Sequence, residues 1–175
     1  MVIFGSSFFG ALVDGSLSAA TKQALNPSKV LGDPNWYANL KKPTWNPPGW
    51  IFPIMWLLIS KPTQLCAVSR ILKYGNGTGG AVTSSTTSHL LALFVYTTHL
   101  ALGDAWNKVF FGLECIGRGT VVISIFLSFL LASTYLFYTI DPAAGYYMLP
   151  TCGWVSVATA LQYSIYFKNK KSIKK

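Results

Sequence analysis

The side chains best suited to chemistry are two histidines and three cysteines, and their spacing predicts neither a catalytic centre nor a metal site. His89 and His99 stand ten residues apart, so on one helix they point in different directions and do not ligate one metal ion together. Cys66, Cys115 and Cys152 are widely separated and form no C-x-x-C pair, which indicates neither a zinc site nor a disulfide framework. For His99, two interpretations stay open: an axial haem ligand, or a hydrogen-bonded histidine inside a helix bundle.

Three titratable residues, Asp14, Lys61 and His99, fall at a similar depth within long apolar segments. An unpaired charge at such a depth in a bilayer is costly. We therefore hypothesise an ion pair between Asp14 and Lys61. The alternatives are that Lys61 extends to the membrane interface, or that Pro62 opens a water-filled kink.

The elements that must position these residues are membrane helices. Hydrophobic residues make up 51% of the 175-residue chain and charged residues only 11%, whereas soluble domains carry about 25% charged residues. A spanning helix needs about 20 mostly apolar residues. Five segments approach this length, and we predict a single all-α membrane domain, a five-transmembrane-helix bundle, over residues 1–175. The predicted helices are 2–24, 48–72, 85–111, 116–140 and 144–167, followed by a basic tail at 168–175.

The net charge of +9 is concentrated beside the apolar segments. With five spans, eleven lysines and arginines fall on the side of the C-terminal tail and two on the opposite side. This bias predicts a cytoplasmic C-terminus by the positive-inside rule. Short basic clusters of this kind are typical of topology signals, so we expect the lipid bilayer as a partner and no nucleic acid.

The segment WYANLKKPTWNPPGWIFPIMW, residues 36–56, holds four of the six tryptophans and four of the nine prolines. Tryptophan collects at membrane interfaces, where one end of the ring is apolar and the other wet. Several indoles that face the inside of a bundle would instead build a flat apolar pocket for a planar ligand. Composition leaves both interpretations open.

The same segment resembles the signature of the translocator protein family, also called tryptophan-rich sensory proteins. Two further blocks agree in order and spacing: AWNKVFFG at 105–112 and PTCGWVSVATALQY at 150–163. The resemblance covers most of the chain from residue 36 onward. Lys108 departs from it by replacing a proline, and Gln162 by replacing an asparagine.

The resemblance implies a membrane protein that forms a homodimer and binds porphyrins, haem-type tetrapyrroles and sterols such as cholesterol. Such a protein would act as a sensor, scavenger or transport factor, not as an enzyme, and would need no cofactor, with porphyrin or haem as a ligand. The alternatives are light-dependent porphyrin breakdown through pocket tryptophans and a structural membrane protein without a small ligand. The resemblance favours the mitochondrial outer membrane for a eukaryotic source, with the endoplasmic reticulum or a bacterial envelope as alternatives.

By position, the resemblance also implies a pocket between the tryptophan-rich loop and the second, fourth and fifth helices. Its residues would be Trp45, Trp50, Phe52, Pro53, Met55, Trp56, Arg118, Val121, Ile125, Trp154, Ala158 and Leu161. Arg118 would pair with a porphyrin carboxylate or lie at the interface. Leu161, Tyr163 and Lys168 also fit a loose sterol-recognition pattern.

Overall fold

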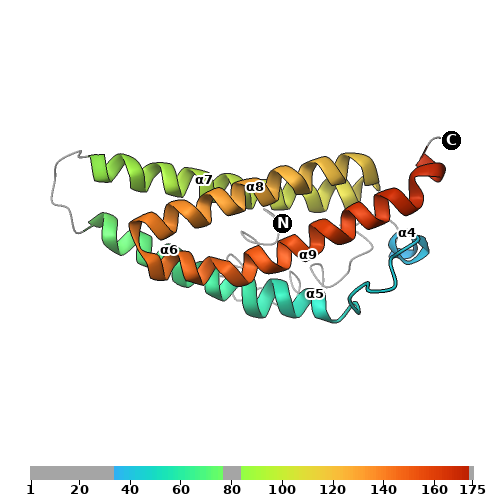
Figure 1. The fold of residues 1–175 in the computed structure, drawn as a ribbon, viewed down its shortest axis with the longest axis horizontal. Helices are drawn as coiled ribbons and strands as arrows, with labels where there is room; N and C mark the ends of the chain where they lie inside the picture. The colour runs from blue at the N-terminus through green and yellow to red at the C-terminus, as the bar shows by residue number, and fades with distance from the viewer. Residues whose placement is uncertain (1–33, 77–83, 174–175) are drawn as a thin grey trace, which may run out of the picture.

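The computed structural model describes residues 34–76 and 84–173, and these ranges contain helices and loops but no strand. The predicted first helix, 2–24, and with it Asp14, lies outside the described residues. The described helices run lengthwise beside one another in an elongated bundle (Figure 1). The prediction of an all-α fold is confirmed.

The helices follow one another in an up-and-down order along the bundle (Figure 1). A short helix and a loop come first, followed by one long helix made of three contiguous pieces. The next helix ends in a π-helical turn, and two further long helices follow it. The bounds are α4 Pro34–Asn39, α5 Ile51–Pro53, η1 Ile54–Ser60, α6 Lys61–Asn76, α7 Ser84–Asn107, η2 Lys108–Gly112, α8 Ile116–Ile140 and α9 Pro142–Ile173.

Two stretches among the described residues are long and apolar enough to cross a membrane, Ile51–Lys73 and Ile116–Ile140. Only 17% and 33% of their most apolar windows are buried inside the protein. An apolar core helix of a soluble protein would be mostly buried, so these exposed apolar faces suit contact with lipid. The helices α7 and α9, of 24 and 32 residues, reach a similar length but are more polar.

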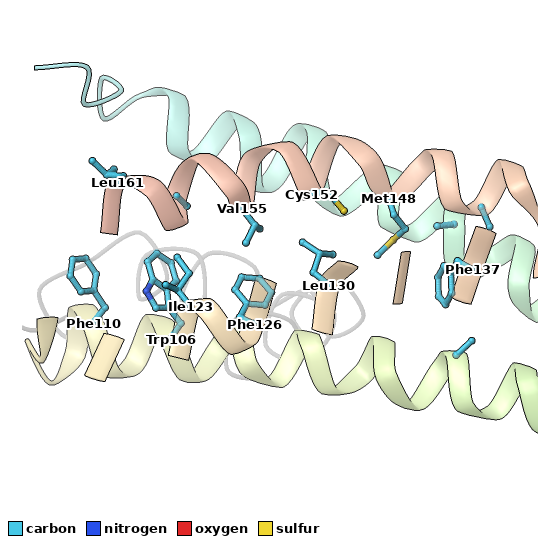
Figure 2. Close-up of a cluster of buried hydrophobic side chains, with 14 of the residues drawn as sticks. Trp106, Phe110, Ile123, Phe126, Leu130, Phe137, Met148, Cys152, Val155 and Leu161 are labelled. Atoms are coloured by element: carbon cyan, nitrogen blue, oxygen red, sulfur yellow. The ribbon is translucent and has the colours of Figure 1, made fainter. Parts of the chain in front are cut away.

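The core lies where α7, α8 and α9 pack together. Figure 2 shows side chains from these helices in a row along the interior, from Phe110 and Trp106 past Phe126 and Leu130 to Phe137. Ile123, Leu130 and Phe137 are fully buried on α8. Their spacing of seven residues places them on one face of that helix, as expected for two turns of 3.6 residues.

The helix bounds differ from the predicted ranges mainly at the ends. The range 116–140 coincides with α8, whereas α9 starts two residues before the predicted 144 and continues six residues past 167. The predicted basic tail is therefore largely helical. Neither Gly nor Pro interrupts residues 168–173, and a buried Asn169 anchors this extension.

Two π-helical segments, η1 and η2, lie toward the same end of the bundle. Pro53 and Pro62 lie at or beside the two ends of η1, and neither has a backbone N–H to donate. A π-helical turn is one way in which a helix accommodates such a break, and it re-aims the side chains that follow. Met55 and Trp56 lie within η1.

The two ends of the bundle differ in construction. We call the end with α4, the 40–50 loop, η2 and the C-terminal part of α9 the lid end, and the opposite end, with the α8–α9 turn, the far end (Figure 1). At the far end Arg70 forms an ion pair with the buried Asp141. Asp141 also accepts a hydrogen bond from the backbone N–H of Ala143 at 3.1 Å, so it caps α9 and ties it to α6.

Candidate ligand-binding site

The 40–50 loop, which we call the lid, is a proline-stiffened turn that closes the lid end. The backbone N–H of Asn46 donates to Pro43 O at 3.1 Å and that of Ile51 to Pro48 O at 3.0 Å. Asn169 on α9 then holds the lid through its side-chain amide. Its Oδ1 accepts from the Lys41 N–H at 3.1 Å and its Nδ2 donates to Lys41 O at 3.0 Å.

Beneath the lid, aromatic rings from α4, α7 and η2 form a continuous cluster. Trp106 stacks on Phe110 with ring centroids 5.7 Å apart and planes 6° from parallel. Trp36 meets Phe110 edge-on at 5.3 Å, and Tyr37 lies 5.5 Å from Phe111. Such pairs contribute roughly 0.5–1.5 kcal/mol each beyond area burial. The cluster therefore attaches α4 to the bundle at the end of α7.

A small cavity of ≈ 10 Å³ lies inside this cluster, between α4, α5, η2 and α9. Aromatic and aliphatic side chains make up almost all of its wall. The lining residues are Tyr37, Phe52, Trp106, Phe110, Phe111, Ala158, Leu161, Gln162 and Ile165. Drug-sized ligands occupy about 300–1,000 Å³, so the cavity as it stands is far smaller than such a ligand.

Two indole N–H groups at this site lack a hydrogen-bond partner among the described residues. Nε1 of Trp106 is buried in the cavity wall, and Nε1 of Trp154 is buried next to Phe52, whose ring centroid lies 5.3 Å from that of Trp154. Buried polar groups are nearly always hydrogen-bonded, and an unmade bond costs about 1–3 kcal/mol. The pair therefore offers two donors to a ligand acceptor in an apolar setting.

The polar part of the wall is Gln162 on α9. Its Nε2 donates to Ile116 O at 3.2 Å and to Thr120 Oγ1 at 3.4 Å, which fixes the side chain against α8. Gly119 makes this approach feasible, because a Cβ there would lie 3.2 Å from Phe110 and 3.3 Å from Gln162 Nε2. The close packing of α8 on α9 thus shapes one wall of the cavity.

Tyr37 lies outside the spanning helices, in α4, where burial raises the pKa of its hydroxyl above the usual value. The tyrosine is therefore neutral near pH 7. Lys42 Nζ lies 4.3 Å from the centroid of the Tyr37 ring, a cation–π contact that holds the lid against α4.

Several predicted pocket residues do meet at this site. Phe52, Ala158 and Leu161 line the cavity, and Trp154 contacts Phe52. Trp56 is half-buried and packs against the core, and Met55 beside it is also half-buried.

Other predicted residues are placed elsewhere. Trp45 and Trp50 in the lid are 50% and 65% exposed, and Pro53 is exposed as well. On α8 the inward face belongs to Gly119, Thr120 and Ile123. The structure consequently directs Arg118, Val121 and Ile125 outward, away from the cavity.

The sterol-pattern residues also separate in space. Leu161 is buried at the cavity, whereas Tyr163 and Lys168 are exposed. Tyr163 pairs through its hydroxyl with Ser124 Oγ on α8 at 2.9 Å. Successive helix positions turn by about 100°, so a loose linear pattern on one helix does not define one face.

The cavity also includes residues that were not predicted as site residues. These are Tyr37, Trp106, Phe110, Phe111, Gln162 and Ile165. Asn169, which holds the lid from outside the cavity lining, was not predicted either. The block 105–112 and the departure at Gln162 were sequence signals for four of them. Nothing in the sequence distinguished Asn169 from the lysines around it.

The mid-bundle polar residues lie apart from the cavity lining. His99 is buried between the rings of Tyr96, 4.8 Å away, and Phe126, 6.0 Å away. Asp104 is near enough to Lys61 for the two opposite charges to attract each other. Asp14, the partner that we hypothesised for Lys61, lies outside the described residues. Within the described ranges, His, Cys, Asp and Glu form no group of three or more that could hold a metal ion.

This arrangement, an apolar helical bundle with a small aromatic cavity under a lid, defines a helical membrane protein. Comparison with known proteins gives the family. The TspO/MBR family matches residues 8–167, and the chain belongs to this family.

Named relatives come from bacteria and mammals. A "Tryptophan-rich sensory protein" of Cereibacter sphaeroides is 31% identical over 134 residues, 77% of each chain. "Protein CrtK" of Rhodobacter capsulatus is 32% identical over 136 residues, 77% of this chain and 78% of the relative. The "Translocator protein" of Homo sapiens is 29% identical over 134 residues, 77% of this chain and 75% of the relative. The predicted family is therefore confirmed.

Proposed function

We propose that this membrane protein binds porphyrins and haem-type tetrapyrroles, and also sterols, in the cavity under the lid, as a sensor, scavenger or transport factor. The observation that carries the proposal is that two buried indole N–H groups lack a partner among the described residues: that of Trp106 in the largely apolar cavity wall, and that of Trp154 beside the wall residue Phe52. A flat aromatic macrocycle stacks on such rings, and its polar edge accepts hydrogen bonds from the indoles.

Ligand entry requires the closed cavity to expand, and the lid is the element suited to move. Its polar contacts with α4 and α9 include the Asn169 amide pair, the Lys42–Tyr37 contact and a hydrogen bond that Lys42 Nζ donates to Ala38 O at 3.3 Å. Burying about 300 Å² of apolar ligand surface contributes roughly 7 kcal/mol before the costs of association are subtracted. That gross energy exceeds the roughly 2 kcal/mol expected for two hydrogen bonds at the lid.

The test is a titration of the purified chain with protoporphyrin, read from the shift of the porphyrin absorbance band, which does not depend on the number of tryptophans. Trp106→Phe and Trp154→Phe keep the apolar ring but remove the donor. We expect each to weaken binding about fivefold, the value of one neutral hydrogen bond. Tyr147→Phe, on the exposed face near the far end, is the matched control and should leave affinity unchanged.

Unchanged affinity in both tryptophan variants would show that the indoles do not contact the ligand. A wild-type protein that produces no absorbance shift would exclude tetrapyrrole binding altogether and favour the structural role. The same titration with cholesterol as a competitor tests whether a sterol occupies the same cavity.

Light-dependent porphyrin breakdown through the pocket tryptophans is the second candidate function. The direct placement of Trp106 in the cavity wall favours it, because an oxidisable ring would lie against the bound macrocycle. Under illumination in air, breakdown predicts a progressive loss of the porphyrin band that Trp106→Phe slows. Simple binding predicts a stable band after saturation.

The proposal extends to assembly and topology. We propose a homodimer, as the resemblance implies, and a cytoplasmic lid end. The described cations support this orientation, because Lys41, Lys42, Lys108, Lys168 and Lys170 lie at the lid end. Protease accessibility of the C-terminus in sealed vesicles tests the orientation, and cross-linking in the membrane tests the dimer.

A further inference from the structure

We propose that lysines of the lid and of α9 form one binding surface for the headgroups of anionic phospholipids. The surface consists of Lys41, Lys42, Lys168 and Lys170. It lies beside the cavity at the lid end and is distinct from it, since none of the four lines the cavity.

The Asn169 amide brings the two lysine pairs together. Lys41 and Asn169 are 128 positions apart in the chain, yet two hydrogen bonds of 3.1 and 3.0 Å join the Lys41 backbone to the Asn169 side chain. Because helix positions turn by about 100° per residue, Lys168 and Lys170 lie on either side of Asn169. Lys41 is thus held against the part of α9 that carries Lys168 and Lys170.

The charges of this surface are available to an external anion. Lys41, Lys168 and Lys170 are exposed, while Lys42 is half-buried and its Nζ donates to Ala38 O at 3.3 Å. The ion pair found within residues 34–76 and 84–173 joins Arg70 to Asp141 at the far end, so no described carboxylate neutralises these lysines. Gathering like charges is unfavourable unless an anion compensates them, and a phosphate-bearing headgroup supplies that compensation.

A lipid source for the anion follows from the aromatic side chains next to the lysines. Tyr163 and Phe167 are 40% and 64% exposed on α9, with ring centroids 6.4 Å apart. Lys170 follows on the same helical face at the i, i+4, i+7 spacing. An exposed aromatic stripe that ends in a lysine is typical of the boundary between acyl chains and headgroups, which places the ammonium groups at headgroup level.

The experiment uses the full chain equilibrated in mixed micelles with equimolar phosphatidylserine and phosphatidylcholine. Native mass spectrometry counts the lipids of each kind that the protein retains. We expect preferential retention of phosphatidylserine and a loss of that preference by at least fivefold in Lys168→Gln/Lys170→Gln, since each lysine near an anionic surface contributes about a fivefold factor. Lys168→Arg/Lys170→Arg should keep the preference.

Two further variants separate this surface from general charge and from folding. Asn169→Leu keeps every lysine but releases the lid, and we expect a two- to fivefold loss of preference. Lys73→Gln removes an exposed cation near the far end and should change nothing. Far-UV circular dichroism and gel filtration confirm that each variant is folded.

Three results would overturn the proposal. They are an equal loss in Lys73→Gln, an unchanged preference in the double glutamine variant, and stoichiometric displacement of phosphatidylserine by protoporphyrin, which would assign the lysines to ligand carboxylates. Because lipid retention is measured without a tetrapyrrole, failure of the proposed porphyrin binding leaves the main readout intact.

Discussion

The lid end and the far end of the bundle use opposite packing strategies. At the far end, regular α-helices meet through the Arg70–Asp141 ion pair and through Gly145, where an added Cβ would lie 2.5 Å from Tyr138 Cβ. At the lid end, a proline-rich loop and the π-helical segment η2 lie at a cavity. Two buried indole N–H groups at or beside this cavity lack a partner among the described residues, whereas the far end is joined by an ion pair and close backbone contact.

This difference between the two ends indicates which part of the protein is expected to move. Interfaces joined by close backbone contact resist separation because any shift loses many contacts at once. A lid held by a few hydrogen bonds and one cation–π contact moves at a smaller cost. We therefore expect stability to depend most on the far end and ligand exchange to depend most on the lid end.

The largest expected effect is on stability, from Gly145→Ala at the far end. The new methyl group meets Tyr138 Cα at 2.8 Å as well as its Cβ, so α8 and α9 must separate, and we expect a loss of about 3 kcal/mol. A thermal melt in detergent should show a decrease in Tm of several degrees. Gly153→Ala on the same helix, where no atom lies within 4 Å of the added Cβ, is the control, and an equal decrease there would contradict the contrast.

The second prediction concerns how the Arg70–Asp141 ion pair and its protonation at low pH affect stability. The hydrogen bond from Arg70 holds the pKa of Asp141 below its usual value of 3.8. Because the pKa of Asp141 is lower in the folded protein than in the unfolded chain, its interactions stabilise the fold at pH values above the unfolded pKa. This stabilisation is lost as the pH falls through the folded pKa. We expect Asp141→Asn to cost roughly 1–2 kcal/mol at pH 7, because Arg70 is partly exposed and solvent screens the pair.

Melting curves between pH 7 and pH 3 check this assignment. The wild type should be equally stable at pH 7 and pH 5.5 and should weaken below about pH 4, while Asp141→Asn should lose less over that interval. Parallel pH profiles for the two proteins would place the acid sensitivity at another group.

A smaller effect is expected on ligand exchange from Asn169→Leu at the lid end. The substitution removes both hydrogen bonds to Lys41, and we expect porphyrin release to accelerate about fivefold with little change in the association rate. Stopped-flow displacement measures the release rate. Ser156→Ala, which removes only a local bond within α9, should release ligand at the wild-type rate, and matching rates in both variants would show that the lid is not the gate.

The smallest effect is expected at the turn between η2 and α8. Glu114 has φ 55, a left-handed conformation that costs a non-glycine residue about 1 kcal/mol. We expect Glu114→Gly to change stability by less than 1 kcal/mol, with relief of strain opposed by the greater freedom of the unfolded chain. A change in Tm of several degrees in Glu114→Gly would show that the Glu114 side chain has a larger structural role.

Some helices and site residues could be predicted from the sequence more closely than others. The apolar run that forms α8 has sharp polar limits, and the predicted range 116–140 coincides with the helix. The continuation of α9 through 168–173 was not predicted, because the cluster of lysines was interpreted as a charged tail. Lysine nevertheless has a good helix propensity, so the helix continues. Of the residues expected at the pocket by position, Phe52, Ala158 and Leu161 line the cavity. Arg118, Val121 and Ile125 face outward, since the rotation of α8 depends on its packing against α7 and α9.

The sequence by itself determined the all-helical membrane class, through apolar runs of bilayer length, and the family, through three motif blocks. It also indicated that most of the lysines and arginines gather at one end of the bundle. The tertiary structure was needed to show which buried indoles lack a partner among the described residues, that Asn169 holds the lid, and that Lys41 lies against the part of α9 with Lys168 and Lys170. The physical reason is that hydropathy is a local property of the chain, whereas each of these contacts depends on how helices distant in sequence rotate and pack against one another.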